Sequence, residues 1–212
     1  MKVALIVDSY KPKTGGPSVI LKETRDALIK KNINVKIISN DFYKNKGKKL
    51  LRLNINKFDI CHLYGGWTYF HIQSFLLALN LKKKIIIHPL GYYEPWSLNQ
   101  KKIKKKIAWN IYQKKILSNA DMIHCASKLE KKNLLKQNKF SNIKVIPYGI
   151  ADNLIKKKIR KKKTRKKAIF FSRIHKKKGL ENLIKAWINI DDKNWSLDIC
   201  GPAESKKYLK KL

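Results

Sequence analysis

Short, uninterrupted apolar runs recur through the first 150 residues and constrain the fold more than any other feature. Residues 3–7 and 85–87 form such runs, with no polar residue between the apolar ones. Runs of this kind are typical of parallel strands that are buried on both faces. Stretches with apolar residues at helical spacing lie between them. This alternation predicts an α/β fold, a doubly wound parallel sheet with its ligand crevice at the carboxyl ends of the strands.

The individual elements follow from local signals. The Gly15-Gly16-Pro17 loop should open a helix, because proline suits the first helical turn. Residues 127–130 have the S-x-x-E spacing of a capping box, which marks another helix start. We expect strands at residues 3–7, 35–38, 58–63, 85–87, 122–126 and 145–147, and helices over residues 70–79 and 98–117.

The alternation breaks at residues 151–167. Residues 155–167 contain ten basic residues and almost no apolar surface, so this stretch cannot pack as a core element. A second βαβ start follows, with a strand at 168–172, a helix at 179–190, a strand at 197–200 and a short basic helix to residue 212. We therefore expect an N-terminal domain over 1–150, a basic linker over 151–167, and an incomplete second domain over 168–212.

Cationic residues are concentrated in the turn that follows the first strand of the second domain. Arg173 and Lys178 lie five positions apart, and Gly179 precedes the helix. Two fixed cations and a helix N-terminus at the carboxyl end of a strand suit a diphosphate. The alternative is a basic turn in a lysine-rich protein. That alternative accounts for Lys178 but not for Arg173, because arginine supplies only five of the 50 basic residues.

The formal net charge of +36 invites a nucleic-acid interpretation. Lysine and isoleucine are abundant and arginine is scarce, a pattern that an A/T-rich genome produces without any partner. Nucleic-acid readers favour arginine for bidentate contacts. RNA binding is therefore the weaker alternative, and we expect no nucleic-acid partner. Trp109 and Tyr112, near the lysines of residues 101–106, are better explained as core residues. The charge still favours anionic lipid surfaces.

Cysteine usage and hydropathy indicate a cytosolic protein without a metal. Cys61, Cys125 and Cys200 lie far apart near the ends of apolar runs, as expected of reduced, packed thiols. The Cys61-His62 and His124-Cys125 pairs lack a short ligand spacing, and no D-x-D triplet occurs. We expect no metal and no other cofactor. No apolar run approaches the ~20 residues of a membrane span, so we expect a cytoplasmic protein, soluble or peripheral at the inner face of the membrane.

Taken in order, these motifs resemble family 4 of the glycosyltransferases. The matching parts include the Gly15-Gly16-Pro17 loop, residues 145–150, Arg173 and Lys178-Gly179. Residues 88–98 resemble the segment that opens the acceptor cleft in bacterial members. The resemblance implies a GT-B-like fold with two Rossmann-like domains, an acceptor-side domain at residues 1–150 and a nucleotide-sugar-binding domain after the linker.

The resemblance also implies a reaction. A sugar would pass from a nucleotide-diphosphate sugar to a glycan or lipid-linked acceptor in polysaccharide biosynthesis, with retention and without a covalent protein intermediate. Gly16, Arg173 and Lys178 would bind the donor diphosphate, because preorganised cations stabilise the charge that develops on the leaving group. Gly16 would let its backbone approach the phosphate or the sugar.

The acceptor-side candidates follow the first and fourth predicted strands. His88 is the candidate catalytic residue, since it lies at the crevice edge and could contact the donor sugar or the acceptor. Equally, it could be a strand-end histidine bonded to backbone. Gly15, Tyr92 and Glu94 are further acceptor-side candidates. The Pro95-Trp96 pair could line the acceptor site or simply fix the start of the next helix.

The sequence departs from the family pattern in three places. Tyr148 replaces a usual asparagine, and Leu90 stands where many members have arginine. The family's second domain continues to two glutamates eight residues apart, whereas this chain has only Glu181 and Glu204 after Gly179. We therefore expect a truncated product, a split gene or a fragment that is inactive alone. The alternative function is an inactive relic or a partner-binding subunit.

The helix expected over residues 98–117 carries two apolar stripes. One contains Ile103, Ile107 and Ile111, and the opposite one contains Trp109, Tyr112 and Ile116. We expect one stripe to pack on the sheet and the other, with its lysine neighbours, to contact an anionic membrane. The alternative is that the fold buries both.

Overall fold

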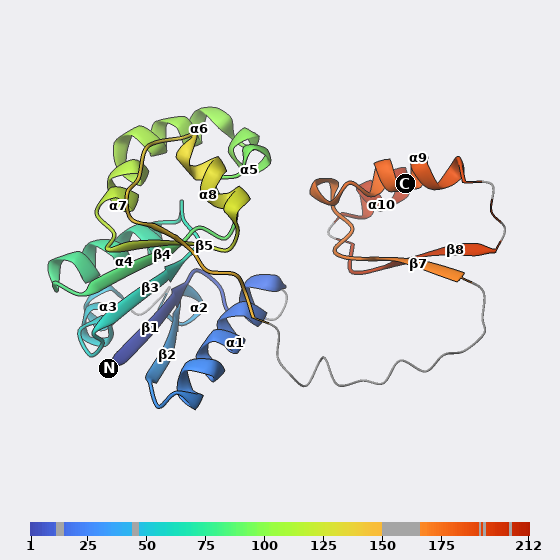
Figure 1. The fold of residues 1–212 in the computed structure, drawn as a ribbon. Coiled ribbons are helices and arrows are strands. Elements are labelled where there is room, and N and C mark those ends of the chain that lie inside the picture. The colour runs from blue at the N-terminus through green and yellow to red at the C-terminus, as the bar shows by residue number, and fades with distance from the viewer. Residues whose placement is uncertain (12–14, 44–46, 150–165, 191, 193, 204) are drawn as a thin grey trace. The chain divides into compact units, whose positions relative to one another are not determined.

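The chain forms two compact units, Met1–Ile155 and Lys156–Leu212 (Figure 1). A computed structural model describes residues 1–11, 15–43, 47–149, 166–190, 192, 194–203 and 205–212. The expected linker, residues 151–167, therefore lies outside the described residues except for Lys166 and Lys167, which belong to a strand.

Unit 1 is built on a six-stranded, wholly parallel sheet with the strand order β2-β1-β3-β4-β5-β6. All six expected strands form, and none of their ends is shifted by more than two residues. Their bounds are β1 (Lys2–Val7), β2 (Asn34–Ser39), β3 (Ile60–Tyr64), β4 (Lys84–His88), β5 (Met122–Cys125) and β6 (Ile143–Val145).

Helices cover both faces of this sheet, which confirms the doubly wound α/β architecture. On one face, α1 (Gly16–Lys30) buries Leu21 against Leu5 and its neighbours in β1. The other face carries the larger core, which includes Leu63 of β3 and Phe75 of α4 (Tyr69–Asn80). Three helices complete this part of the unit: α2 (Asn40–Tyr43), α3 (Gly47–Ile55) and α8 (Lys128–Leu135).

The prediction of a single helix over residues 98–117 is wrong. The structure has α5 (Pro95–Asn99), α6 (Lys102–Ala108), the π-helical turn η2 (Trp109–Gln113) and α7 (Lys114–Ser118). Gln100 is extended and Lys101 is left-handed at φ 55°, so the helical hydrogen bonds stop between α5 and α6.

The expected division into two stripes is confirmed. Ile116 is buried, and Trp109 and Tyr112 pack against the main core. The three isoleucines of the other stripe are exposed.

Unit 2 contains a two-stranded parallel sheet, β7 (Lys166–Phe171) and β8 (Trp195–Cys200). The turn η4 (Lys176–Lys178) leads into α9 (Leu180–Ile188), and α10 (Lys206–Lys211) ends the unit. Its core is small: Ile174, Leu180 and Tyr208 are the buried hydrophobic residues, with Phe170 and three other apolar residues packed against them.

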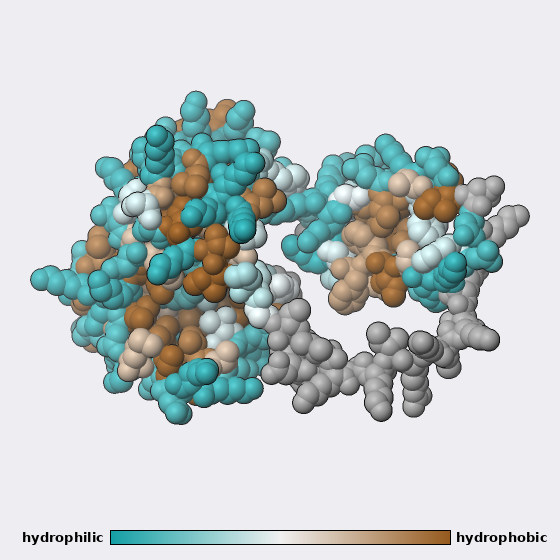
Figure 2. Space-filling model, viewed as in Figure 1, coloured by the Kyte–Doolittle hydropathy of each residue, from teal (hydrophilic) through white to brown (hydrophobic). Residues whose placement is uncertain are grey.

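Apolar residues also reach the surface of both units (Figure 2). In the part of the chain that the structure describes, no helix is long and apolar enough to cross a membrane.

Candidate functional site

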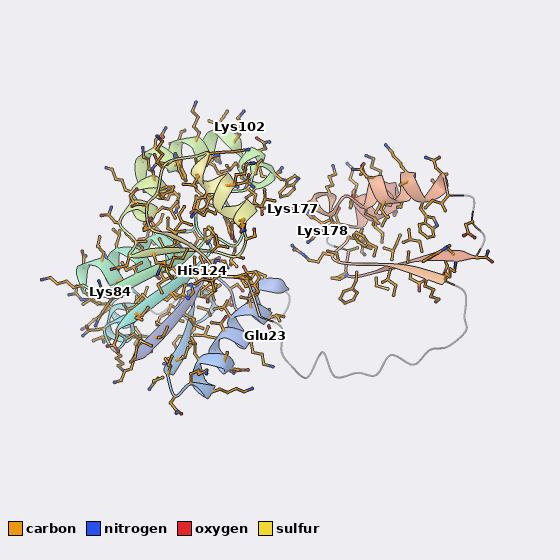
Figure 3. All side chains as sticks on the ribbon, in the orientation of Figure 1. Glu23, Lys84, Lys102, His124, Lys177 and Lys178 are labelled. Carbon is orange, nitrogen blue, oxygen red and sulfur yellow. The ribbon has the colours of Figure 1, made fainter. Side chains whose placement is uncertain are left out.

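The two expected phosphate-binding cations lie on one turn at the carboxyl end of β7. Arg173 follows this strand, and Lys178 ends η4; both side chains are exposed. Figure 3 labels Lys178 and its neighbour Lys177 on this turn. Gly179 is left-handed at φ 69° and precedes α9. The turn therefore presents cations beside the N-terminus of a nine-residue helix, which is the arrangement expected for an anion.

A close parallel approach of two backbone segments, beyond the ends of β7 and β8, fixes this turn in place. The Ser172 amide donates to Cys200 O at 3.0 Å, and the Ile174 amide donates to Pro202 O at 2.9 Å. Gly201 has φ 151°, and a Cβ built on it would lie 1.8 Å from Ser172 O. Only glycine fits where the two segments approach each other. The sequence did not reveal this requirement, because it depends on how two distant strand ends meet.

The first glycine loop forms the start of α1, as predicted. Gly15 is left-handed at φ 71°. Its carbonyl accepts hydrogen bonds from the Ser18 amide at 3.1 Å and from Ser18 Oγ at 2.8 Å. A Cβ built on Gly16 would have no atom of the described residues within 4 Å. None of the described residues thus blocks the approach of a ligand to the backbone of Gly16.

His88 is buried at the end of β4, and both of its ring nitrogens have partners. Nδ1 donates to His124 O at 2.5 Å, and the Tyr148 hydroxyl donates to Nε2 at 2.5 Å. Burial, reinforced by nearby His124, lowers the pKa of His88 to about 4. The imidazole is therefore neutral at pH 7. This geometry matches the second expectation for His88, a strand-end histidine bonded to backbone.

Three histidines form a row across neighbouring strands. The ring of His124 in β5 lies 4.3 Å from that of His88 and 5.5 Å from that of His62 in β3, centroid to centroid (Figure 3 labels His124). Burial and the two neighbouring rings lower the pKa of His62. Among the described residues, no three His, Cys, Asp or Glu side chains are placed to hold a metal ion.

Glu130 connects the loop after β4 to the end of β5. Its carboxylate accepts from the Gly91 amide and from the Ala126 amide, each at 2.7 Å. Ser127 Oγ caps α8 by accepting from the Glu130 amide at 3.1 Å, so the predicted helix start is confirmed. The glutamate side chain, however, bridges two loops at the crevice edge. Glu130 is a positioning residue that the sequence alone did not reveal.

Tyr92 and Glu94 lie in the loop that Glu130 holds. Tyr92 is 37% exposed, and its ring lies 3.6 Å from where a Cβ on Gly65 would be. Burial raises the pKa of Tyr92, and the negative charge of Asp8 raises it further, so the loop after β4 lies near the end of β1. Glu94 occupies the N-cap position of α5.

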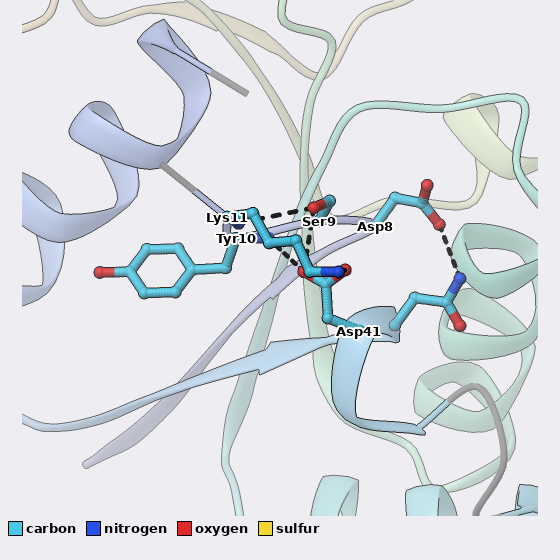
Figure 4. A network of polar contacts seen from close by, with 6 residues as sticks. Asp8, Ser9, Tyr10, Lys11 and Asp41 are labelled. Atoms are coloured by element: carbon cyan, nitrogen blue, oxygen red, sulfur yellow. Dashed lines mark hydrogen bonds and ion pairs between the residues drawn. The ribbon is translucent and has the colours of Figure 1, made fainter. Parts of the chain in front are cut away.

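A pocket of about 360 Å³ opens beside Asp8, at the carboxyl ends of β1 and β2. Asn40 Nδ2 donates to Asp8 Oδ1 at 3.2 Å, and neighbouring Asp41 accepts from Ser9 Oγ and from the Tyr10 amide at 2.9 Å (Figure 4). The side chains with polar groups that line the pocket belong to Asp8, Asn40, Tyr43, Lys48, Thr68, Tyr69 and Gln73. Sequence reasoning missed this pocket because its residues come from four separate segments.

Several solved structures share this architecture. HepE (Alr3699) from Anabaena, in complex with UDP-glucose, matches with a TM-score of 0.72 at 17% identity, over 100% of this chain and 64% of that chain. Its complex with UDP and glucose gives a TM-score of 0.70. MurG from Acinetobacter baumannii matches with a TM-score of 0.52 at 12% identity, over 97% of this chain and 68% of that chain. This chain thus spans less than two thirds of the length of HepE.

The fold is that of the GT-B glycosyltransferases. Residues 152–212, which include the Arg173 turn, match the family described as glycosyl transferases group 1. No curated protein matches the sequence.

Proposed function

We propose that this protein acts as a glycosyltransferase that moves a sugar from a nucleotide-diphosphate sugar to a glycan or lipid-linked acceptor, with retention, in polysaccharide biosynthesis. One observation carries the proposal. Arg173 and Lys178 lie together on the turn before α9, within the region that matches glycosyl transferases group 1. The complex of HepE with UDP-glucose supports a uridine donor.

The donor diphosphate would bind at this turn. Arg173 offers a planar fork to phosphate oxygens, and Lys178 adds a point charge. As the bond to the sugar breaks, negative charge grows on the leaving diphosphate, and fixed cations stabilise it. The two side chains supply this charge without a metal or a cofactor.

The acceptor sugar would bind in the pocket beside Asp8. Asp8, Asn40 and Gln73 offer acceptors and donors for sugar hydroxyls. Tyr69 is 74% exposed and offers an aromatic ring for stacking. Gly15, Tyr92 and Glu94 would extend this acceptor side. His88 remains the candidate catalytic residue, and it would contact substrate only after Tyr148 releases its Nε2.

The proposed partners are the donor and the acceptor, not a nucleic acid. We place the reaction in the cytoplasm, with peripheral contact to the membrane. A partner-binding subunit is the second candidate. The observation that favours it is the open face of β7, where Phe171 is 86% exposed. Phe171→Ser should abolish any complex that buries this face, as measured by analytical ultracentrifugation.

Calorimetric titration of the full chain with UDP and UMP tests the donor proposal. UDP should bind at least about tenfold more tightly, because charge-assisted contacts to a second phosphate contribute roughly 1.5–3 kcal/mol. Arg173→Ala should remove most of this preference, and Arg173→Lys should restore little of it. Lys185→Ala, an exposed position in α9, is the matched control. Equal affinity for UDP and UMP, or an unchanged preference in Arg173→Ala, would contradict the proposal.

A further inference from the structure

Three large apolar side chains lie exposed along the outer side of α6 and η2. Ile103 is 77% exposed, Ile107 is 54% exposed and Ile111 is 65% exposed. They recur every four residues, so they form one continuous stripe. The opposite side already faces the core of unit 1 through Trp109, Tyr112 and the buried Ile116. The core of unit 1 therefore supports the helical segment on the side opposite the stripe.

The segment that carries this stripe is rich in lysine and has no acidic residue. Residues 95–120 contain seven lysines and no aspartate or glutamate. Lys102 and Lys106 lie on one side of the stripe and Lys104 lies on the other, at about 100° per residue. All three are exposed, and Figure 3 shows Lys102 directed away from α6. Their stems extend the apolar surface while their ammonium groups remain in water.

One lysine of this segment has a different role. Lys105 is half-buried; its Nζ donates to Ser97 O at 2.5 Å and lies 5.6 Å from the centre of the Trp67 ring. Lys105 thus fixes α6 to α5 and to the loop after β3. Lys102, Lys104 and Lys106 are exposed instead, so packing does not account for the charge on the outer surface.

A groove of about 500 Å³ runs beside the isoleucine stripe. Residues of α5, α6 and η2 line it, together with Gln137 beyond the end of α8. Lys102, Lys105 and Lys106 line it together with apolar Leu98 and Trp109. The groove thus combines lysine and apolar side chains, which suits the phosphate and upper acyl region of an anionic lipid.

We propose that the outer surface of α6 and η2 docks onto an anionic lipid bilayer. Ile103, Ile107 and Ile111 would insert at the boundary between headgroups and acyl chains, and the lysines would contact anionic headgroups. A single-stranded nucleic acid would instead need exposed aromatic rings beside the charge. The aromatic residues of α6 and η2 themselves, Trp109 and Tyr112, pack against the core. The inference does not depend on the transferase reaction.

Vesicle flotation of the full chain tests this surface. Binding should occur to phosphatidylcholine vesicles that contain phosphatidylglycerol, should be weak on pure phosphatidylcholine, and should fall with salt. The triple substitution Ile103→Ser, Ile107→Ser, Ile111→Ser should weaken binding about tenfold or more, because it removes the inserted apolar area. Its matched control is Ile29→Ser, Leu53→Ser, Leu79→Ser, which changes exposed apolar residues on α1, α3 and α4 and should leave binding unchanged.

A second pair of variants separates local charge from net charge. Lys102→Gln, Lys104→Gln, Lys106→Gln should weaken binding by about fivefold per lysine. Lys30→Gln, Lys31→Gln, Lys82→Gln removes the same charge from other exposed positions and should have a much smaller effect. Equal losses from both lysine triples, or equal binding to anionic and neutral vesicles, would overturn the proposal.

Folding of the isoleucine variant is checked by its thermal unfolding curve. If that variant does not fold, Ile107→Trp provides an independent measurement. The fluorescence of the new indole should be quenched by brominated lipids in anionic vesicles, beyond the quenching seen for the unsubstituted protein. No additional quenching would show that this stripe does not insert.

Discussion

The two units use the same kind of apolar strand but support it differently. In unit 1, helices cover both faces of the sheet, so adjacent residues of β1 such as Leu5 and Ile6 are both buried. In unit 2, α9 and α10 pack on one side of β7 and β8 (Figure 1). There, Ile169 is 63% exposed and Phe171 is 86% exposed. The proposed diphosphate site therefore lies on the unit with the smaller core.

The largest effect should come from a substitution at Gly201, where two backbone segments of unit 2 approach closely. Gly201→Ala would place a methyl group 1.8 Å from Ser172 O in the present geometry, at a φ of 151°. The strands must separate, and the small core cannot compensate, so we expect unit 2 to unfold while unit 1 remains folded. Hydrogen exchange resolved by residue measures this.

Gly149→Ala is the control for Gly201→Ala. A Cβ there would meet no described atom within 4 Å, so the substitution should leave exchange in both units unchanged. If the amides of β7 and β8 stay protected from exchange in Gly201→Ala, the close approach of Gly201 to Ser172 is contradicted.

Lowering the pH should reduce the stability of unit 1 more than that of unit 2, the opposite of the effect expected for Gly201→Ala. Burial lowers the pKa of His71 and of His88 to about 4. The folded state thus binds fewer protons than the unfolded state between pH 6.5 and 4, and stability is lost as the pH falls through this window. The loss should reach about 3 kcal/mol for each histidine by pH 4. In unit 2 the one histidine, His175, is not buried.

Urea unfolding of unit 1 at several pH values measures this loss. His88→Gln should flatten the pH dependence, although it also lowers stability at pH 7 by disturbing the contact with Tyr148. A free energy of unfolding that is constant between pH 7 and 5 would contradict the buried, neutral state of both histidines.

A matched pair of core substitutions sharpens the comparison. Leu5 is 0% exposed and Leu180 is 1% exposed. Leu5→Ala and Leu180→Ala should each cost about 3 kcal/mol. Unit 1 should tolerate this loss, whereas unit 2 should unfold because its buried core consists of Leu180 with Ile174 and Tyr208. Limited proteolysis measures both outcomes; equal resistance of the two units in the two variants would show that unit 2 is better supported than its contacts indicate.

The smallest effect concerns the loop after β4. Glu130→Gln retains one acceptor but weakens the charge-assisted bonds from the Gly91 and Ala126 amides, so we expect a loss of about 2 kcal/mol. Exchange of these two amides should accelerate while β1 and β2 stay protected. Glu23→Gln in α1 is the control and should change neither. Unaltered exchange at Gly91 would show that the carboxylate does not hold the loop.

The sequence predicted those parts of the molecule that depend on local patterns. The strands follow from apolar runs, the starts of α1 and α8 follow from Pro17 and Ser127, and the turn cations follow from the position of Arg173 after a strand. The break before α6 was not predictable, because the left-handed residue there is a lysine, and lysine gives no signal for that backbone conformation.

The bridging role of Glu130 and the pocket beside Asp8 could not be predicted for a different reason. Gly91 and Ala126 are far apart in the sequence, and only the assembled sheet brings their amides to one carboxylate. Likewise, Asp8 and Gln73 line one pocket because β1 ends and α4 begins at the same edge of the sheet. Contacts between distant segments decide these features, and local spacing does not encode them.

The central claim is that unit 2 binds the donor diphosphate and unit 1 binds the acceptor sugar. Amide chemical-shift mapping of the isotope-labelled full chain with UDP, and separately with a neutral oligosaccharide, tests this most directly. UDP should shift signals from residues 172–182, and UMP should shift them much less. The oligosaccharide should shift signals around Asp8, Asn40 and Gln73. Equal shifts with UDP and UMP, or nucleotide shifts confined to unit 1, would contradict the account.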